Sequence, residues 1–432
     1  MSMLYLTGKY ANVCNRVSLG GYDATPAGAN GSVTVTPSAA SAYPIDNVCD
    51  RDPSTPTILG SLVSNSHFDL FHSALANRSF DAAFSPSSDW TDASAGTGTA
   101  ARTTDPTKYN TGTGGALLTS NGSGNEAEMA QRITVVAGEH RRLIVYAKAL
   151  SGVPVMTFTI YNPQTGHWWN GTTWTTVPSA VTPTGTVNGV SFTQLYADYQ
   201  VEDYDTVFGD TTYLLIYVTN RSAAASELGV DDTADVPGIN FCGVFGHNLG
   251  DITNPTLQHD ITNGYVGLET SFAMTAARGS FFVNCTMSYS PYWRFVIGGT
   301  NWDEPYIGEL VFGQVKTCAT DPKAGPRRTL DLPSIGHMSP IGRLGVYPLA
   351  SASRRSVGLT FQAKTAAAAR EIAVIYERSQ AGRYPVIIAP ISTEADVYYG
   401  RLTAPHVEDR PIDKFWESSM DLIGDPLPLV GA

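Results

Sequence analysis

The sequence of 432 residues lacks the features of several large classes of protein. No apolar run approaches the roughly 20 residues that span a membrane, and the first residues, MSMLYLTGKYANVC, lack the charged and apolar regions of a secretory signal. Only 15% of the residues are charged, the formal net charge is −12, and Lys and Arg form no basic stripe. We therefore expect a soluble protein made in a cytoplasm, with no membrane insertion and no nucleic-acid partner.

Cysteine is scarce and widely spaced. The five cysteines are Cys14, Cys49, Cys242, Cys285 and Cys318, and no CxxC pair occurs. An odd number of distant cysteines in a chain of this length argues against a disulfide framework. We expect reduced residues of the core rather than metal ligands or nucleophiles.

Motifs of common enzymes are also missing. The sequence has no GxSxG, HExxH or HxH, and its glycine-rich stretches GTGTAARTT and NTGTGG lack the Lys that would meet a phosphate. The acidic pairs Glu202-Asp203 and Asp231-Asp232 are adjacent, and neighbouring residues of a strand point to opposite faces. We expect a protein that is not an enzyme, with polysaccharide degradation as the minor alternative.

The residues that are abundant favour strands and turns. The chain has 41 Gly, 26 Pro and 21 Tyr, with many Thr and Ser. Strand-like runs separated by turn signals cover 116–120, 127–136, 141–150, 155–162, 191–201 and 212–220. This spacing suits a sandwich of two antiparallel sheets, so the expected class is mainly β, with several β-sandwich or jelly-roll domains.

Changes in pattern along the chain predict three domains. Segments 1–76 and 237–320 each look incomplete, which suggests one discontinuous domain into which 77–236 is inserted. Residues 321–432 form the third domain, where KTAAAAREIAVIYERSQAG predicts a helix that carries the apolar residues Ile372, Val374 and Ile375 and ends at Gly382. The segment from Phe415 onward is expected to be an extended tail lying on a neighbouring subunit.

Three stretches carry a resemblance to a known family. They are SAASAYPIDNVCDRDPSTP, FCGVFGHNLGD and YWRFVIGGTNWDEPYIGELVFGQ. The discontinuous domain resembles the discoidin-like jelly rolls of phage tail proteins, although Thr57 to Gly60 lack the usual Trp. The third domain loosely resembles the C-terminal domains of phage tail-associated proteins. This resemblance implies a structural virion protein that assembles with other virion proteins, with three- or sixfold symmetry.

The inserted segment shows a second resemblance. Its NRSFD start, Trp90 and closing LGVDDT resemble carbohydrate-binding-module jelly rolls. In that family the start and the end of the domain lie close together and often hold a structural calcium. The matching positions are Asn77, Asp81, Asp231 and Asp232, which otherwise serve as turn-capping carboxylates.

The densest group of aromatic residues lies in YNPQTGHWWNGTTWTT, turned at Asn170-Gly171. Its members are Tyr161, His167, Trp168, Trp169 and Trp174. Exposed indoles would suit a sugar or a protein partner, whereas buried ones would make a structural ribbon, and the sequence leaves both interpretations open.

Two further groups have structural interpretations. Trp293 is expected on the buried face of its strand and Arg294 on the other, paired with Asp303 or Glu304. His247 and Asn248 are expected to bond the backbone of their turn.

The sequence therefore predicts a structural component of a phage tail, baseplate or tail tip, whose inserted jelly roll attaches to host surface glycans. The alternatives are a head decoration or fibre protein, a glycan-degrading enzyme with an accessory module, and a bacterial surface adhesin.

Overall fold

The structure is a computed structural model. It describes residues 4–6, 30–36, 57–58, 66–75, 80, 90–202, 211–247, 255–260, 270–277, 280–297, 306–318, 320, 322, 327–331, 334–338, 344–348, 354–363, 365–379, 385–389, 397–403, 407–412 and 415–424. The protein is mainly β, with several antiparallel sheets and, in the part described, one helix near the C-terminus. The expected fold class is confirmed. No helix in these ranges is long and apolar enough to cross a membrane.

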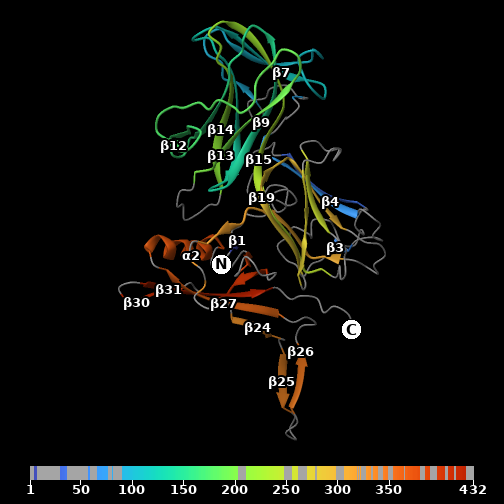
Figure 1. The fold of residues 1–432 in the computed structure, drawn as a ribbon, viewed down its shortest axis with the longest axis vertical. Helices are drawn as coiled ribbons and strands as arrows, with labels where there is room; N and C mark the ends of the chain where they lie inside the picture. Colours follow the sequence, from blue (N-terminus) through green and yellow to red (C-terminus); the bar gives the residue numbers. More distant parts are fainter. Residues whose placement is uncertain are drawn as a thin grey trace.

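The upper part of the molecule in Figure 1 is a sandwich of two sheets. The first sheet has the order β12 (Trp174–Thr175), β11 (His167–Trp169), β10 (Met156–Asn162), β14 (Thr211–Asn220), β8 (Ala127–Val136) and β5 (Thr91–Asp92). The second contains β13 (Thr193–Gln200), β9 (His140–Ser151), β15 (Ala225–Phe245), β7 (Gly115–Asn121) and β6 (Thr99–Thr103). Buried residues such as Phe158, Ile216 and Val145 fill the space between them, because alternate residues of each strand point inward.

Strand β15 continues out of this sandwich into a second one. Its first half pairs with β7 and β9, and its second half pairs with β19 (Ser280–Tyr289) and β22 (Glu309–Gly313). The short β18 (Thr275–Ala277) extends this sheet. The facing sheet has the order β17 (Thr270–Ala273), β16 (Thr256–Asp260), β20 (Tyr292–Ile297), β4 (Ser66–Ser73) and β2 (Asn30–Thr36), beside the pair β21 (Tyr306–Ile307) and β3 (Thr57–Ile58). Trp293, Phe295, Leu310 and Phe312 lie in the core of this second sandwich.

The lower part in Figure 1 is a third sheet with the helix beside it. Its order is β23 (Lys316–Thr317), β1 (Leu4–Leu6), β28 (Val386–Ala389), β29 (Tyr398–Leu402), β31 (Phe415–Gly424), β27 (Arg354–Ala363) and β24 (Arg327–Asp331), and β30 (Val407–Ile412) pairs with β31. The hairpin of β25 (Ser334–Met338) and β26 (Leu344–Pro348) extends below it. Helix α2 (Ala366–Arg378) buries Ile372 and Ile375 against this sheet.

Two expectations for this third part are corrected. The helix ends at Arg378 and is capped by Ser379, so it stops before Gly382. Residues 415–424 form a central strand of the chain's own sheet, because β31 pairs with β27 on one side and with β29 and β30 on the other. They are therefore not part of an extended tail.

Strand β1 also belongs to this third sheet, through its pairing with β23 and β28. The predicted division into 1–76 with 237–320, 77–236 and 321–432 stays a prediction.

A buried ionic network lies where the chain passes between the first two sandwiches. Arg141, fully buried, donates from Nε to Asp235 Oδ1 at 2.6 Å and from Nη1 to Glu139 Oε2 at 2.5 Å. Tyr199 donates to the other oxygen of Asp235 at 2.6 Å, and the backbone of Asp235 bonds Ser73 Oγ. Although burial opposes the charged form, the carboxylates of Asp235 and Glu139 outweigh it and raise the pKa of Arg141. The network therefore ties the end of β4 to β9, β13 and β15.

Candidate functional site

An aromatic pair stands on the outside of the six-stranded sheet. Tyr161 of β10 is the cross-strand partner of Trp168 of β11, and their rings stack with centroids 4.5 Å apart at 27°. Both side chains are partly exposed, whereas Ile160, between two outward residues of β10, is fully buried. Such a pair offers a large apolar plate with polar edges.

The other two tryptophans of the hairpin face inward. Trp169 and Trp174 are cross-strand partners with centroids 5.8 Å apart, and both pack against the core of the sandwich. Trp169 is only 7% exposed, and Trp174 donates from Nε1 to the carbonyl of Gln200 at 2.8 Å. The structural and the binding interpretation of the aromatic group therefore apply to different residues. Trp169 and Trp174 pack in the structure, whereas Trp168 and Tyr161 are accessible to a partner. A binding role for Trp168 and Tyr161 stays a prediction.

The outer face of the sheet continues beyond this pair. Tyr161 lies opposite Leu215 of β14, and Leu215 lies opposite Arg132 of β8. Arg132 places its guanidinium 3.9 Å from the ring centroid of Tyr213, and Tyr217 is a further partly exposed aromatic residue on β14. The face therefore combines aromatic plates with a cation.

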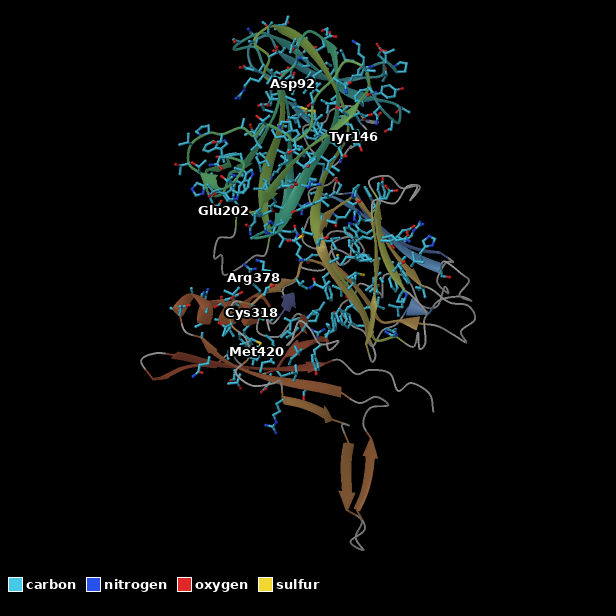
Figure 2. All side chains as sticks on the ribbon, viewed as in Figure 1. Asp92, Tyr146, Glu202, Cys318, Arg378 and Met420 are labelled. Carbon is cyan, nitrogen blue, oxygen red and sulfur yellow. The ribbon has the colours of Figure 1, made fainter. Side chains whose placement is uncertain are left out.

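His167 has a defined partner that the sequence did not indicate. Its Nδ1 lies 2.6 Å from Oε1 of Glu202, which follows β13 of the opposite sheet. Figure 2 shows Glu202 at the lower end of the upper sandwich, just below the position of β12 in Figure 1. The sequence suggested Glu202 only as half of an acidic pair, because residues this far apart become neighbours only when the two sheets pack. Asp203 lies outside the described residues.

Asp231 and Asp232 both bind the loop at Asn110 and Thr111. Oδ2 of Asp231 accepts from the backbone N–H of Asn110 at 2.7 Å and of Thr111 at 2.8 Å. Asp232 accepts from Asn110 Nδ2 at 3.0 Å and from Thr111 Oγ1 at 2.6 Å. The expectation that the two carboxylates point to opposite faces is wrong. A bulge in β15 between Asp231 and Ala234, with Asp232 at φ 45°, turns both toward the same loop.

The predicted calcium site is only partly described. Asn77 and Asp81 lie outside the described residues. Three oxygens of Asp231 and Asp232 already accept hydrogen bonds, which is the turn-capping role, while the buried Oδ1 of Asp231 has no hydrogen-bond partner. Within the described ranges, no group of three or more His, Cys, Asp or Glu could hold a metal ion. Calcium needs six to eight oxygen ligands, so the described residues alone do not make a site for it, and calcium stays a prediction.

The carboxyl of Asp231 is nevertheless unusual. Burial raises its pKa to about 7; the hydrogen bond from the backbone N–H of Thr111 opposes this rise, and the charge of the neighbouring Asp232 adds to it.

The remaining sequence candidates are structural where they are described. Trp293 is 1% exposed, and Arg294 on the other face donates to both oxygens of Asp69 at 2.6 and 2.9 Å. The expected partners Asp303 and Glu304, like Asn248, lie outside the described residues. His247 is buried, which lowers its pKa to about 4.

The described cysteines are free thiols. Cys242 and Cys318 are buried and Cys285 is partly buried. Burial raises the pKa of Cys285 to about 11 and that of Cys242 well above its usual value, so neither is a thiolate at neutral pH.

No family model matches the sequence, and no curated protein matches it. Among solved structures, the chain is similar to the enzymatically active domain of tailspike protein 4 of bacteriophage CBA120, with 16% identity, a TM-score of 0.28, and coverage of 38% of this chain and 21% of that chain. It thus spans about a fifth of the length of that chain.

The chain is also similar to TmCBM61 in complex with β-1,4-galactotriose, with 16% identity, a TM-score of 0.25, and coverage of 38% of this chain and 97% of that chain. A third similarity is to the family 11 carbohydrate-binding module of cellulase Lic26A-Cel5E of Clostridium thermocellum, with 10% identity, a TM-score of 0.22, and coverage of 34% and 85%. These are distant matches to carbohydrate-binding-module β-sandwich folds and to a phage tailspike domain, and they identify no family.

Proposed function

We propose that this chain is a structural component of a tailed-phage virion, in the tail, baseplate or tail tip, and that the outer face of its six-stranded sheet binds a host surface glycan. The observation that carries the glycan part is the stacked pair of Tyr161 and Trp168, which the fold leaves partly exposed while it buries Trp169. Sugar rings present apolar C–H faces that stack on such plates, and their hydroxyls bond polar neighbours. The virion part rests on the resemblance of the sequence to discoidin-like phage tail proteins.

The glycan part is tested by a glycan array followed by titration calorimetry with the best ligand. We expect Trp168→Ala and Tyr161→Ala to weaken binding about tenfold or more, because truncating a central aromatic residue removes most of its contact energy. Tyr146→Ala is the matched control. Tyr146 is also a partly exposed tyrosine but lies on β9 of the other sheet, on the opposite side of the sandwich in Figure 2. A full array with no binding, or equal losses from all three variants, would rule out the glycan site.

The location is tested by cryo-electron microscopy of the intact particle. We expect the chain in a three- or sixfold ring or cap, with Trp168 facing outward. If Trp168 is covered by a neighbouring subunit, the same aromatic face serves assembly, which is the second candidate function. Finding the chain on the capsid would make it a head decoration protein.

We also propose that the chain does not turn over its ligand. Release of reducing ends from a bound polysaccharide by the pure protein would contradict this and revive the glycan-degrading alternative.

A further inference from the structure

The aromatic pair is held at the two ends of one short turn. Residues 163–166 connect β10 to β11, and together with the last residue of β10 and the first of β11 they form the 162–167 turn, which Tyr161 precedes and Trp168 follows. Within the turn, the backbone N–H of Gly166 bonds the carbonyl of Asn162 at 2.9 Å, and Gly166 has φ 76°, a conformation natural to glycine. The shape of this turn therefore decides whether the two rings meet.

A single carboxylate from the opposite sheet holds this turn at its beginning, middle and end. Oε2 of Glu202 accepts from Asn162 Nδ2 at 3.0 Å and from Thr165 Oγ1 at 2.7 Å, and Oε1 lies 2.6 Å from Nδ1 of His167. The Glu202 side chain is only 15% exposed, so these contacts are partly shielded from water. Charge-assisted bonds of this kind are about twice as strong as neutral ones.

The segment that carries Glu202 also holds the other strand of the hairpin. The carbonyl of Gln200, two residues earlier, accepts from Nε1 of Trp174 at 2.8 Å. The end of β13 therefore fixes the hairpin through two separate contacts, one at the 162–167 turn and one at β12. Nothing in the sequence pairs these segments, which come from different sheets.

We propose that Glu202 is the positioning residue of the aromatic pair: its carboxylate sets the 162–167 turn and thereby the stacking of Tyr161 on Trp168. This inference rests on the proposed glycan function for its effect on affinity, but the stacking itself can be measured without a ligand. A carboxylate only accepts hydrogen bonds, so the contact between Glu202 Oε1 and His167 Nδ1 requires a proton on Nδ1 of His167. Glu202 thus determines the tautomer of that ring.

The substitution Glu202→Gln tests the proposal with almost no change in side-chain size. The amide keeps one acceptor but turns an N–H₂ group toward donors of the turn, so the three contacts cannot all persist. We expect glycan affinity to fall about tenfold while the melting temperature stays within a few degrees of wild type. Glu227→Gln is the matched control, because it makes the same chemical change in the same sandwich away from the turn. The Glu227 side chain is 35% exposed, and its Oε2 lies 4.0 Å from Nζ of Lys108.

Two spectroscopic readouts separate positioning from general stability. In wild type, ¹⁵N spectra of His167 should show the Nδ1–H tautomer, and near-ultraviolet circular dichroism should carry the coupled Tyr161–Trp168 signal. Both the ¹⁵N spectrum and the circular dichroism should change in Glu202→Gln. Neither should change in Glu227→Gln. In the Glu202→Gln and Trp168→Ala double variant, the affinity losses should be less than additive, because both remove the same contact.

The outcomes distinguish the two proposals. If wild type binds no glycan but Glu202→Gln changes both spectra, the proposed function fails and the positioning role stands on its structural readouts. If Glu202→Gln leaves the spectra and the affinity at wild-type values, the positioning role is overturned. It is equally overturned if affinity falls only in proportion to the fraction of unfolded protein.

Discussion

The raised pKa of Asp231 makes a sharp prediction about stability and pH. The substitution Asp231→Asn keeps an oxygen that can accept from the backbone of Asn110 and Thr111, and it places a neutral N–H₂ group where the unpartnered Oδ1 lies. The variant therefore mimics the protonated carboxyl at every pH. Any difference from wild type reports the free energy that wild type loses when this buried group ionises.

The sign follows from the direction of the shift. Burial raises the pKa of Asp231 to about 7 in the folded protein from an ordinary value of 3.8, so the folded state holds the proton more tightly than the unfolded state. Wild type should lose stability relative to Asp231→Asn as pH rises from about 4 to about 7, and the gap should be constant above that. A difference of about 3 between the folded and unfolded pKa values corresponds to at most about 4 kcal/mol, and solvent screening lowers the expected loss to about 1 to 3 kcal/mol.

The assay is chemical denaturation at pH 4, 6 and 8 in the presence of a chelator. We expect equal unfolding free energies at pH 4 and a more stable variant at pH 8. Asp232→Asn is the matched control, because this neighbouring carboxylate is partly exposed and accepts from side chains, and it should not reproduce the gain.

The result that would refute the reasoning is a less stable Asp231→Asn at pH 8. If calcium then raised the melting temperature of wild type but not of the variant, the group would be an ionised cation ligand. That outcome would support the calcium site expected from the resemblance to carbohydrate-binding modules, because a ligand that binds only the folded state stabilises it by mass action.

Other predictions concern the core and the junction between sandwiches. Arg141→Met should lower the unfolding free energy by about 3 to 5 kcal/mol in denaturant titrations, because it leaves Asp235 and Glu139 buried without their cation. Phe158→Ala should lower it by about 3 to 5 kcal/mol by leaving a cavity in a fully buried position. Trp168→Ala should cost about 1 kcal/mol or less in the same assay, because its ring is partly exposed. A loss from Trp168→Ala as large as that from Phe158→Ala would contradict its placement on the outer face.

Strand positions were largely predictable from local pattern. The run 127–136 coincides with β8, and 155–162 and 212–220 differ by one residue from β10 and β14. Alternation with a period of two suffices here because each of these strands has one face in the core and one outside. The pattern at 225–236 was less informative, because the predicted inserted segment ended at residue 236. In the structure, β15 contains a bulge between Asp231 and Ala234 and continues to Phe245.

The candidate site was predictable as a group of residues but not in its arrangement. The spacing of the tryptophans gives no indication of which indole faces outward, because that depends on the register of β10 against β11. The role of Glu202 was not visible at all, since it depends on two sheets meeting across the sandwich. Similarly, Arg141 meets Asp235 only once β9 and β15 are paired.

The amino-acid sequence by itself determined the mainly β class, the positions of most strands and the turn at Asn170-Gly171, because backbone preference and alternation act between near neighbours in the chain. Only the tertiary structure decided that Trp168 stacks partly exposed on Tyr161 while Trp174 packs on the core, that Asp231 is buried with one oxygen unpartnered, and that Glu202 holds the aromatic turn. Those outcomes depend on contacts between segments tens of residues apart, whose free energies are set by burial and geometry rather than by local sequence.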